Sequence, residues 1–249
     1  MQHSPDTLID LLTDQAEARP DARALLWQHR AISYSALLRS VQRFAAQCAA
    51  RYQPGDRIGV LAWNCPEFVS LLYAVPAAGQ ILVPLNARLA GAELSEQIRA
   101  AGIRTLLGHD ELLEKIAASP GLEQISLEQD LEAWLATPTP ALSGEFLGRP
   151  DDPAWILFTS GTTGRPKGAT LTHRSLLAGL ESAAHGRPVR SDDRYLFPFP
   201  LFHIAAHNVL LQHQHGACVV LLRSFTAGSV LEYANREMIA DALNGRQKL

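Results

Sequence analysis

The sequence contains few cysteines and no block of like charge. Its three cysteines, at positions 48, 65 and 218, are too far apart for a metal-binding clip. An odd number of separated thiols is typical of buried cysteines in a reducing compartment, so we expect a cytoplasmic protein. The formal net charge of the 249 residues is −3, and the lysines and arginines are scattered. This distribution gives no electrostatic footprint for nucleic acid.

Uninterrupted apolar runs are also missing. Residues 68–87 carry no charge, but prolines and a glycine divide them into a helix and a short strand. Residues 195–222 contain no Lys, Arg, Asp or Glu, yet they include two prolines and four histidines. Neither stretch is a continuous apolar helix of spanning length, so we expect no transmembrane segment. No basic flank precedes an apolar segment at the N-terminus, so we expect no signal peptide.

Glycine and hydroxyl residues are concentrated in one place. Residues 159–164 consist only of Ser, Thr and Gly. Gly161 and Gly164 permit positive φ, so that successive backbone N–H groups can turn toward one anion. Further donors come from the hydroxyls of Thr159, Ser160, Thr162 and Thr163, and Lys167 adds a mobile positive charge. We therefore predict a polyphosphate-binding loop.

The surroundings of this loop distinguish it from the common nucleotide loops. An apolar run over residues 154–158 predicts a buried strand before it, and Thr172 is the expected N-cap of a following helix. The P-loop requires Gly before its lysine and a hydroxyl after it, where this chain has Pro166 and Gly168. The dinucleotide fingerprint fails because position 163 is not Gly. A flexible linker is the alternative, but a linker has no need of a lysine behind a proline.

A second group of residues with chemical potential lies at 199–203, with His207 four residues on. A proline, an aromatic ring and an imidazole that enter a helix would line an apolar pocket with one polar group at its mouth. Metal binding is the competing interpretation, because His203 and His207 would share a helical face. The spacing is similar to H-E-x-x-H, but Ile204 replaces the glutamate, and no carboxylate ligand is near in sequence. His213 and His215 are expected to be ordinary polar positions before a strand.

Predicted helices and strands alternate along the chain. The expected helices cover residues 7–18, 33–51, 66–78, 91–101 and 111–117, and the expected strands 24–27, 31–33, 57–62, 81–84, 105–107, 122–126 and 217–222. This alternation predicts a parallel sheet in an α/β fold. Residues 137–150 are rich in Pro and Gly and look like a linker. We take them to separate a first α/β lobe, residues 1–136, from a second lobe, residues 151–249.

Residues 159–168 match throughout the signature Thr-Ser-Gly-Thr-Thr-Gly-x-Pro-Lys-Gly, and with it the chain resembles the adenylate-forming enzymes, also called AMP-binding acyl-CoA synthetases. Residues 54–60, 64–67 and 83–89 look like the N-terminal region of that family, and residues 200–204 look like its second core motif. The resemblance covers nearly all of the chain to about Phe225. It implies layered, mostly parallel sheets with flanking helices, as in an incomplete N-terminal domain of such an enzyme.

The resemblance also implies a function. Family members use ATP and Mg²⁺ to convert a carboxylic acid, here with a fatty acid favoured, to an acyl-adenylate, and then form a thioester with coenzyme A. By this resemblance, residues 159–164 and Lys167 hold the phosphates, with Lys167 also catalytic. His203 would lie beside the reacting carboxylate, and Phe202 and His207 would line the acyl pocket.

The sequence departs from the family in its extent. Family members are about twice this length, and the chain has no Tyr-Gly-x-Thr-Glu element, no later Asp for the ribose, no hinge and no counterpart of the family's C-terminal lysine that contacts the substrate carboxylate. Our first hypothesis is therefore the N-terminal half of an acyl-CoA synthetase. The alternative is a non-catalytic remnant that binds phosphate or a partner protein. A P-loop kinase or NTPase is disfavoured by Pro166 and Gly168.

Overall fold

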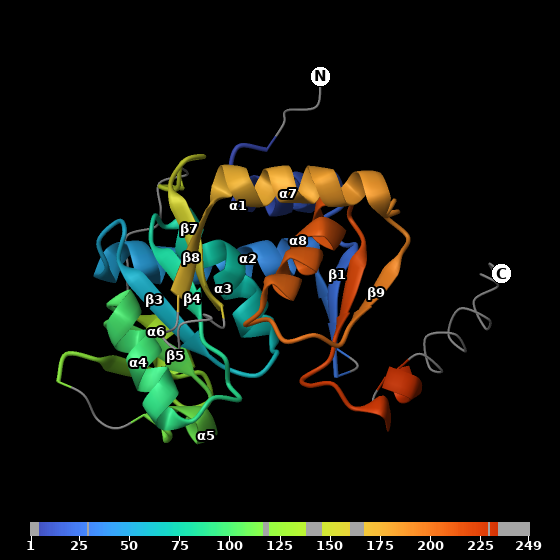
Figure 1. Cartoon of the computed structure of the whole chain (residues 1–249). Helices are drawn as coiled ribbons and strands as arrows, with labels where there is room; N and C mark the ends of the chain where they lie inside the picture. The colour runs from blue at the N-terminus through green and yellow to red at the C-terminus, as the bar shows by residue number, and fades with distance from the viewer. Residues whose placement is uncertain are drawn as a thin grey trace.

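The computed structural model describes residues 5–28, 30–116, 120–137, 146–159, 167–228 and 230–233. In this part the chain forms two mainly parallel sheets with helices between and around them (Figure 1). The predicted α/β class with layered parallel sheets is confirmed. No helix among these residues is both long enough and apolar enough to cross a membrane.

The larger sheet has six strands in the order β6-β5-β3-β4-β7-β8. They are β3 (Arg57–Leu61), β4 (Ile81–Pro84), β5 (Thr105–Gly108), β6 (Glu123–Ser126), β7 (Pro153–Thr159) and β8 (Lys167–Thr172). All neighbours run parallel except β7 and β8, which form an antiparallel hairpin. Every residue of β4 and β5 is buried, as is typical of parallel strands that are covered on both faces.

The smaller sheet has the order β2-β1-β10-β9. Its strands are β1 (Arg23–Trp27), β2 (Arg30–Ser33), β9 (Arg194–Phe197) and β10 (Cys218–Leu221). The predicted hairpin β1–β2 is confirmed, and β1, β10 and β9 run parallel. Because β1 pairs with β10 and β4 with β7, strands from residues 1–136 and 151–249 lie together in each sheet. The division into two lobes stays a prediction.

Eight α-helices and one 3-10 helix are described around the sheets. They are α1 (Leu8–Ala18), α2 (Tyr34–Arg51), α3 (Pro66–Ala77), α4 (Gly91–Ala101), α5 (Asp110–Leu113), α6 (Leu131–Ala136), α7 (His173–Gly186), η1 (Ile204–Ala206) and α8 (His207–Gln214). One apolar core joins α1, α2, α3 and α8 to both sheets, and α2 and α3 run between the sheets (Figure 1). A second core lies between the larger sheet and helices α4 and α5.

Helix α3 is buried on all sides, and its ends explain how an apolar helix with two prolines is tolerated. Pro66 occupies the first helical position, where no intrahelical N–H bond is lost. Pro76, in the last turn, cannot donate to the carbonyl oxygen of Leu72. The indole Nε1–H of Trp155 donates to that carbonyl instead, at 3.1 Å, so that β7 satisfies a group that α3 leaves free.

Most predicted elements are present, with ends shifted by one or two residues. Ser33 and Thr172 cap α2 and α7 as expected, accepting from backbone N–H groups at 3.2 and 3.1 Å. Gly102 ends α4 in the left-handed conformation, with φ of 64°. The helix predicted over residues 111–117 is wrong in extent, because α5 ends at Leu113. Strands β8 and β9 and helix α6 were not predicted.

Candidate functional site

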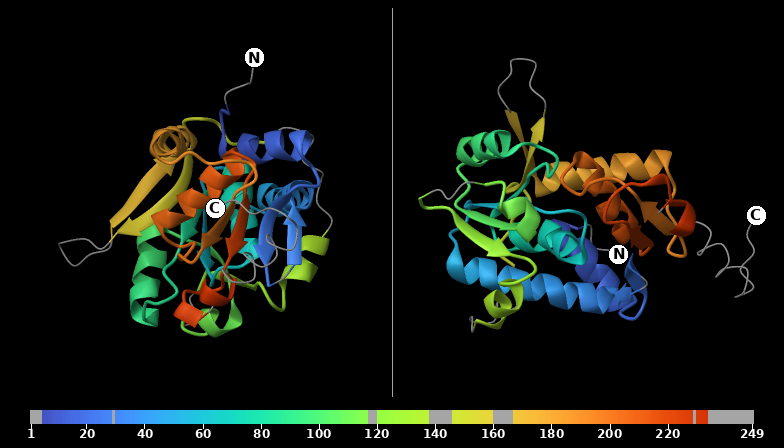
Figure 2. Two further views of the ribbon diagram at one scale, coloured as in Figure 1. Left: turned by 90° about the vertical axis from the view of Figure 1, so that its right-hand side faces the viewer. Right: turned by 90° about the horizontal axis from the view of Figure 1, so that it is seen from below.

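The predicted polyphosphate loop connects β7 to β8. The structure describes its two ends, Thr159 and Lys167, whereas Ser160, Gly161, Thr162, Thr163 and Gly164 lie outside the described residues. The two ends face each other in the antiparallel register, and the Thr159 hydroxyl donates to the Lys167 carbonyl at 3.4 Å. Figure 2 shows β7 and β8, in yellow, extending beyond the body of the molecule. Both end residues are exposed.

Close strand packing explains Gly168, which stands where a P-loop would have a hydroxyl. Gly168 pairs with Phe158 in the hairpin, and a Cβ atom at position 168 would lie 2.7 Å from Cγ2 of Ile156. No real Cβ atom tolerates so short a contact without movement of its neighbour. Glycine therefore allows the β8 backbone to pass over the Ile156 side chain at the base of the loop.

The base of the loop lies at the carboxyl edge of the larger sheet. Strands β6, β5, β3, β4 and β7 are parallel, so that their carboxyl ends share one edge with Thr159. Ligands of open α/β sheets bind outside this edge. Asn64 follows β3 at the same edge, and since β4 separates β3 from β7, the two strand axes are about 10 Å apart.

Asn64 is the site residue that sequence reasoning missed. Its buried side-chain Nδ2 donates to the carbonyl oxygens of Phe199 and Leu222, both at 2.8 Å. Its Oδ1 accepts from the N–H of Leu201, also at 2.8 Å. One amide thus joins the ends of β3, β9 and β10 and holds residues 199–201 in place. A polar residue directly after a buried strand was the available signal.

The segment held by Asn64 carries the predicted pocket residues. Phe202 is half-buried and packs against both apolar cores, and the second core also receives Ile156 and Phe158 of β7. The segment and the base of the loop therefore meet at one edge of the larger sheet. His203 is exposed and precedes η1, with its carbonyl accepting from Ala206 at 2.9 Å. The expectation that His203 and His207 share a helical face is wrong, because His203 lies outside the helix.

His207 is the first residue of α8, and its ring is held against α7. Its Nε2 donates to the carbonyl oxygen of Leu176 at 2.9 Å. A Cβ atom at Gly179 would lie 3.2 Å from the ring, which shows how closely α7 approaches it. Burial lowers the pKa of His207, with a smaller contribution from Arg187 in the same direction. The neutral ring therefore has an unprotonated Nδ1, which can only accept a hydrogen bond.

His213 is not an ordinary polar position, which corrects the expectation from sequence. Its ring is fully buried and stacks on Tyr73, whose hydroxyl lies 2.8 Å from Nδ1. Its Nε2 donates to the carbonyl oxygen of Ala24 at 3.1 Å. Burial lowers the pKa of His213 to about 4, so the ring is neutral near pH 7. We assign His213 to the core rather than to the site.

Comparison of the sequence with models of known protein families gives a match along nearly the whole chain. The model of the AMP-binding enzyme family matches residues 12–240. The chain belongs to the AMP-binding enzyme family. The resemblance noted from the loop sequence is thereby confirmed.

Relatives of this member of the AMP-binding enzyme family are acid ligases by name. A fatty acid–[acyl-carrier-protein] ligase, ScoC, of Streptomyces coeruleorubidus is 33% identical over 241 residues, which cover 92% of this chain and 46% of the relative. A feruloyl-CoA synthase of an Amycolatopsis species is 33% identical over 229 residues, which cover 90% of this chain and 46% of the relative. The chain thus spans about half the length of the curated relatives it matches.

Solved structures of the family share the fold. The N-terminal domain of FACL13 from Mycobacterium tuberculosis superposes with a TM-score of 0.83 at 26% identity, covering 94% of this chain and 61% of that one. An o-succinylbenzoate CoA synthetase from Bacillus subtilis, in complex with ATP and magnesium ion, superposes with a TM-score of 0.77 at 26% identity. The superposition covers 91% of this chain and 60% of that one. The family's N-terminal architecture is therefore the fold of this chain.

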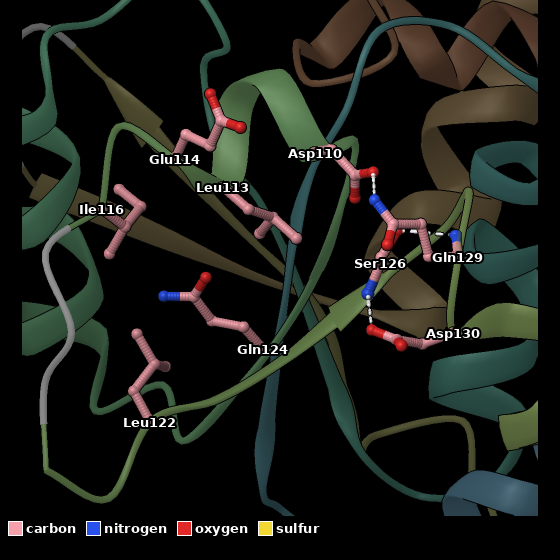
Figure 3. A pocket seen from close by; sticks show the side chains of 9 residues that line it. All are labelled: Asp110, Leu113, Glu114, Ile116, Leu122, Gln124, Ser126, Gln129 and Asp130. Atoms are coloured by element: carbon pink, nitrogen blue, oxygen red, sulfur yellow. Dashed lines mark hydrogen bonds between the residues drawn. The ribbon is translucent and has the colours of Figure 1, made fainter.

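A separate hollow of about 580 Å³ lies between α5 and β6 (Figure 3). Its acidic lining residues are Asp110, Glu114 and Asp130. The Asp110 carboxylate accepts from the side chain of Gln129, and Asp130 accepts from the Ser126 N–H at 2.9 Å. A negative lining repels polyphosphate. Nowhere in the described ranges do three His, Cys, Asp or Glu side chains cluster closely enough for a metal ion.

Proposed function

We propose that this chain is the ATP- and acid-binding part of an AMP-forming acid–thiol ligase. In the first half-reaction a carboxylate oxygen attacks the α-phosphorus of ATP, and pyrophosphate leaves as the acyl-adenylate forms. In the second, the thiol of coenzyme A attacks the acyl carbon and AMP leaves. The observation that carries the proposal is the β7–β8 hairpin, whose paired ends Thr159 and Lys167 lie at the carboxyl edge of a parallel sheet in a chain of this family.

The main barrier to the first half-reaction is electrostatic, because the anionic carboxylate approaches ATP, which carries four negative charges. We assign the β- and γ-phosphates to the backbone N–H groups and hydroxyls of residues 159–164 and to the ammonium of Lys167. These groups would screen the phosphates and stabilise departing pyrophosphate. Mg²⁺ supplies further charge neutralisation when bound. The loop offers hydroxyl and amide donors but no carboxylate, which fits an ion held mainly by phosphate oxygens and water.

The acid would bind beside the segment held by Asn64. Phe202 is at the junction of the two cores and would form an apolar wall for the acyl group. We assign the exposed imidazole of His203 to the hydrogen bond with the reacting carboxylate. His207 would contribute its Nδ1 as an acceptor at the α7 side of the pocket.

A fatty acid is our proposed substrate, and coenzyme A is the proposed acceptor. The name of ScoC supports the acid, and the names of the CoA ligases support the acceptor. The feruloyl-CoA synthase favours an aromatic acid as the second choice. Because the chain spans about half of these relatives, a phosphate-binding chain without ligase activity is the second candidate function.

Carboxylate-dependent exchange of labelled pyrophosphate into ATP tests the proposal directly. We expect exchange with medium- and long-chain acids by the purified chain, and a loss of about 10²–10³-fold in Lys167→Ala, which removes one transition-state contact. Lys167→Arg should retain part of the exchange, and Lys248→Ala is the matched lysine control. Exchange that is unchanged in Lys167→Ala would contradict the loop assignment. Binding of ATP by a folded chain without any exchange would favour the second candidate function.

A further inference from the structure

A groove bordered by α2 and floored by the edge of the larger core has no part in the site described above. It has a volume of about 480 Å³ and lies between the β1–β2 hairpin, α2, the first turn of α3, and α6. None of its lining residues belongs to the β7–β8 hairpin or to residues 199–207. Its chemistry is therefore separate from the proposed ATP and acid sites.

The floor of the groove is apolar. It consists of the side chains of Trp27, Ile32, Leu37, Phe44, Leu131 and Leu135. Leu37 and Phe44 are buried in the larger core, so their positions are fixed by packing. Trp27, Ile32 and Leu135 are half-buried, so they keep apolar surface that a ligand can cover.

The rim of the groove carries three exposed arginines, Arg30, Arg39 and Arg43. Arg39 and Arg43 are four residues apart on α2 and therefore neighbours on one helix face. Arg43 lies 4.0 Å from Glu132, an exposed pair of little strength. In the described part of the chain, neither Arg30 nor Arg39 forms an ion pair. The opposing carboxylates of the lining are Glu67 and Glu132, so positive charge exceeds negative.

We propose that this groove binds a small amphiphilic anion, an alkyl or aryl group that carries one carboxylate or phosphate. The apolar group would cover Trp27 and Ile32, and the anionic head would meet the guanidinium groups, whose planar forks match such oxyanions. The size of the groove fits a small molecule rather than a protein. A helix of a partner is about 10 Å across, and a stable protein interface needs about 800 Å² on each side.

Octanoate is the probe for the first test, and Trp27 supplies the signal. We expect saturable binding of octanoate to the 249-residue chain, seen both as heat and as a change in tryptophan fluorescence. Binding should weaken as salt is raised, because the rim charges are exposed. The double variant Arg39→Gln/Arg43→Gln should bind octanoate about fivefold or more weakly. Trp27→Phe should keep the heat and lose most of the fluorescence change.

Matched controls separate this groove from the proposed acid site. Arg99→Gln changes an exposed arginine on α4 and should leave octanoate binding unchanged. Octyltrimethylammonium has the same chain with the opposite charge and should not bind. Octyl phosphate is compared with octanoate in the same assay. Tighter binding of octyl phosphate that is weakened by the same arginine substitutions would support the groove and indicate that its preferred ligand carries a phosphate. Circular dichroism of each variant checks that the fold is kept.

Two results would overturn the proposal. One is equal affinity of the unaltered chain and the double arginine variant for octanoate. The other is octanoate binding that survives the arginine changes and disappears in Phe202→Ala, which would move the ligand to the proposed acid site. These measurements use neither ATP nor pyrophosphate exchange. Failure of the groove proposal therefore leaves the proposed function unaffected.

Discussion

Single buried polar residues decide how distant parts of this chain are joined. His213 of α8 contacts Tyr73 of α3 and Ala24 of β1, and Asn64 contacts residues that follow β9 and β10. The partners are more than one hundred positions apart in sequence. No local pattern around His213 distinguishes a buried ring that stacks on Tyr73 from an exposed polar residue, which is why its role was wrongly predicted.

Titration of His213 predicts a dependence of stability on pH. Its pKa is lowered from 6.5 to about 4 by burial, so the unfolded chain binds more protons between these values. The stabilisation is complete above pH 6.5 and is lost as the pH falls toward 4, by an amount on the order of 3 kcal/mol. Urea unfolding at a series of pH values measures this loss.

The matched variant for this prediction is His213→Gln, which keeps a donor and an acceptor but does not titrate. We expect lower stability at pH 7 and a flatter dependence between pH 4 and 6.5. The histidines at 109, 173 and 207 also have pKa values lowered by burial, and they remain in both proteins. The difference between the two curves therefore isolates His213, and parallel curves would contradict its assignment.

At the scale of elements, helix α3 depends on a strand for one of its hydrogen bonds. Trp155→Phe keeps most of the buried ring but removes the donor to the Leu72 carbonyl, and we expect a loss of about 2 kcal/mol in unfolding free energy. Pro76→Ala supplies a backbone N–H to the same carbonyl. The double variant should therefore lose less than the sum of the single variants, by about 1 kcal/mol in a double-mutant cycle. Strict additivity would contradict the idea that the indole and the restored N–H satisfy the same carbonyl.

The elements that sequence reasoning found are those with their own local signals. Helix α2 has a serine cap, α4 ends at a left-handed glycine, and the apolar run at residues 154–158 predicts β7. Strand β8 was missed because its first four residues are exposed and show no alternation, so its conformation comes from pairing with β7. Strand β9 is likewise set by pairing with β10. The motif thus gave the candidate site, whereas the three hydrogen bonds of Asn64 to residues 199, 201 and 222 became apparent only in the fold.

At the scale of the whole molecule, the two sheets are built from both ends of the chain. Residues 1–136 alone would lose the β10 neighbour of β1 and the β7 neighbour of β4. Both strands would then have open edges and uncovered apolar faces. We expect residues 1–136 to show no cooperative unfolding transition in urea, in contrast to the 249-residue chain. A sharp transition for this fragment would support the predicted boundary at residues 137–150.

The single amide of Asn64 has a consequence for motion near the proposed acid site. Residues 199–201 are not part of a strand, and their backbone is anchored chiefly through one side chain that is itself fixed at the end of β3. Local opening of this segment must break bonds that also secure the end of β10. The amide hydrogen of Leu201, which Asn64 accepts, should therefore exchange with solvent at a rate close to those of the sheet, although the segment is a loop. The wall of the pocket would then fluctuate with the core of the molecule rather than with its surface.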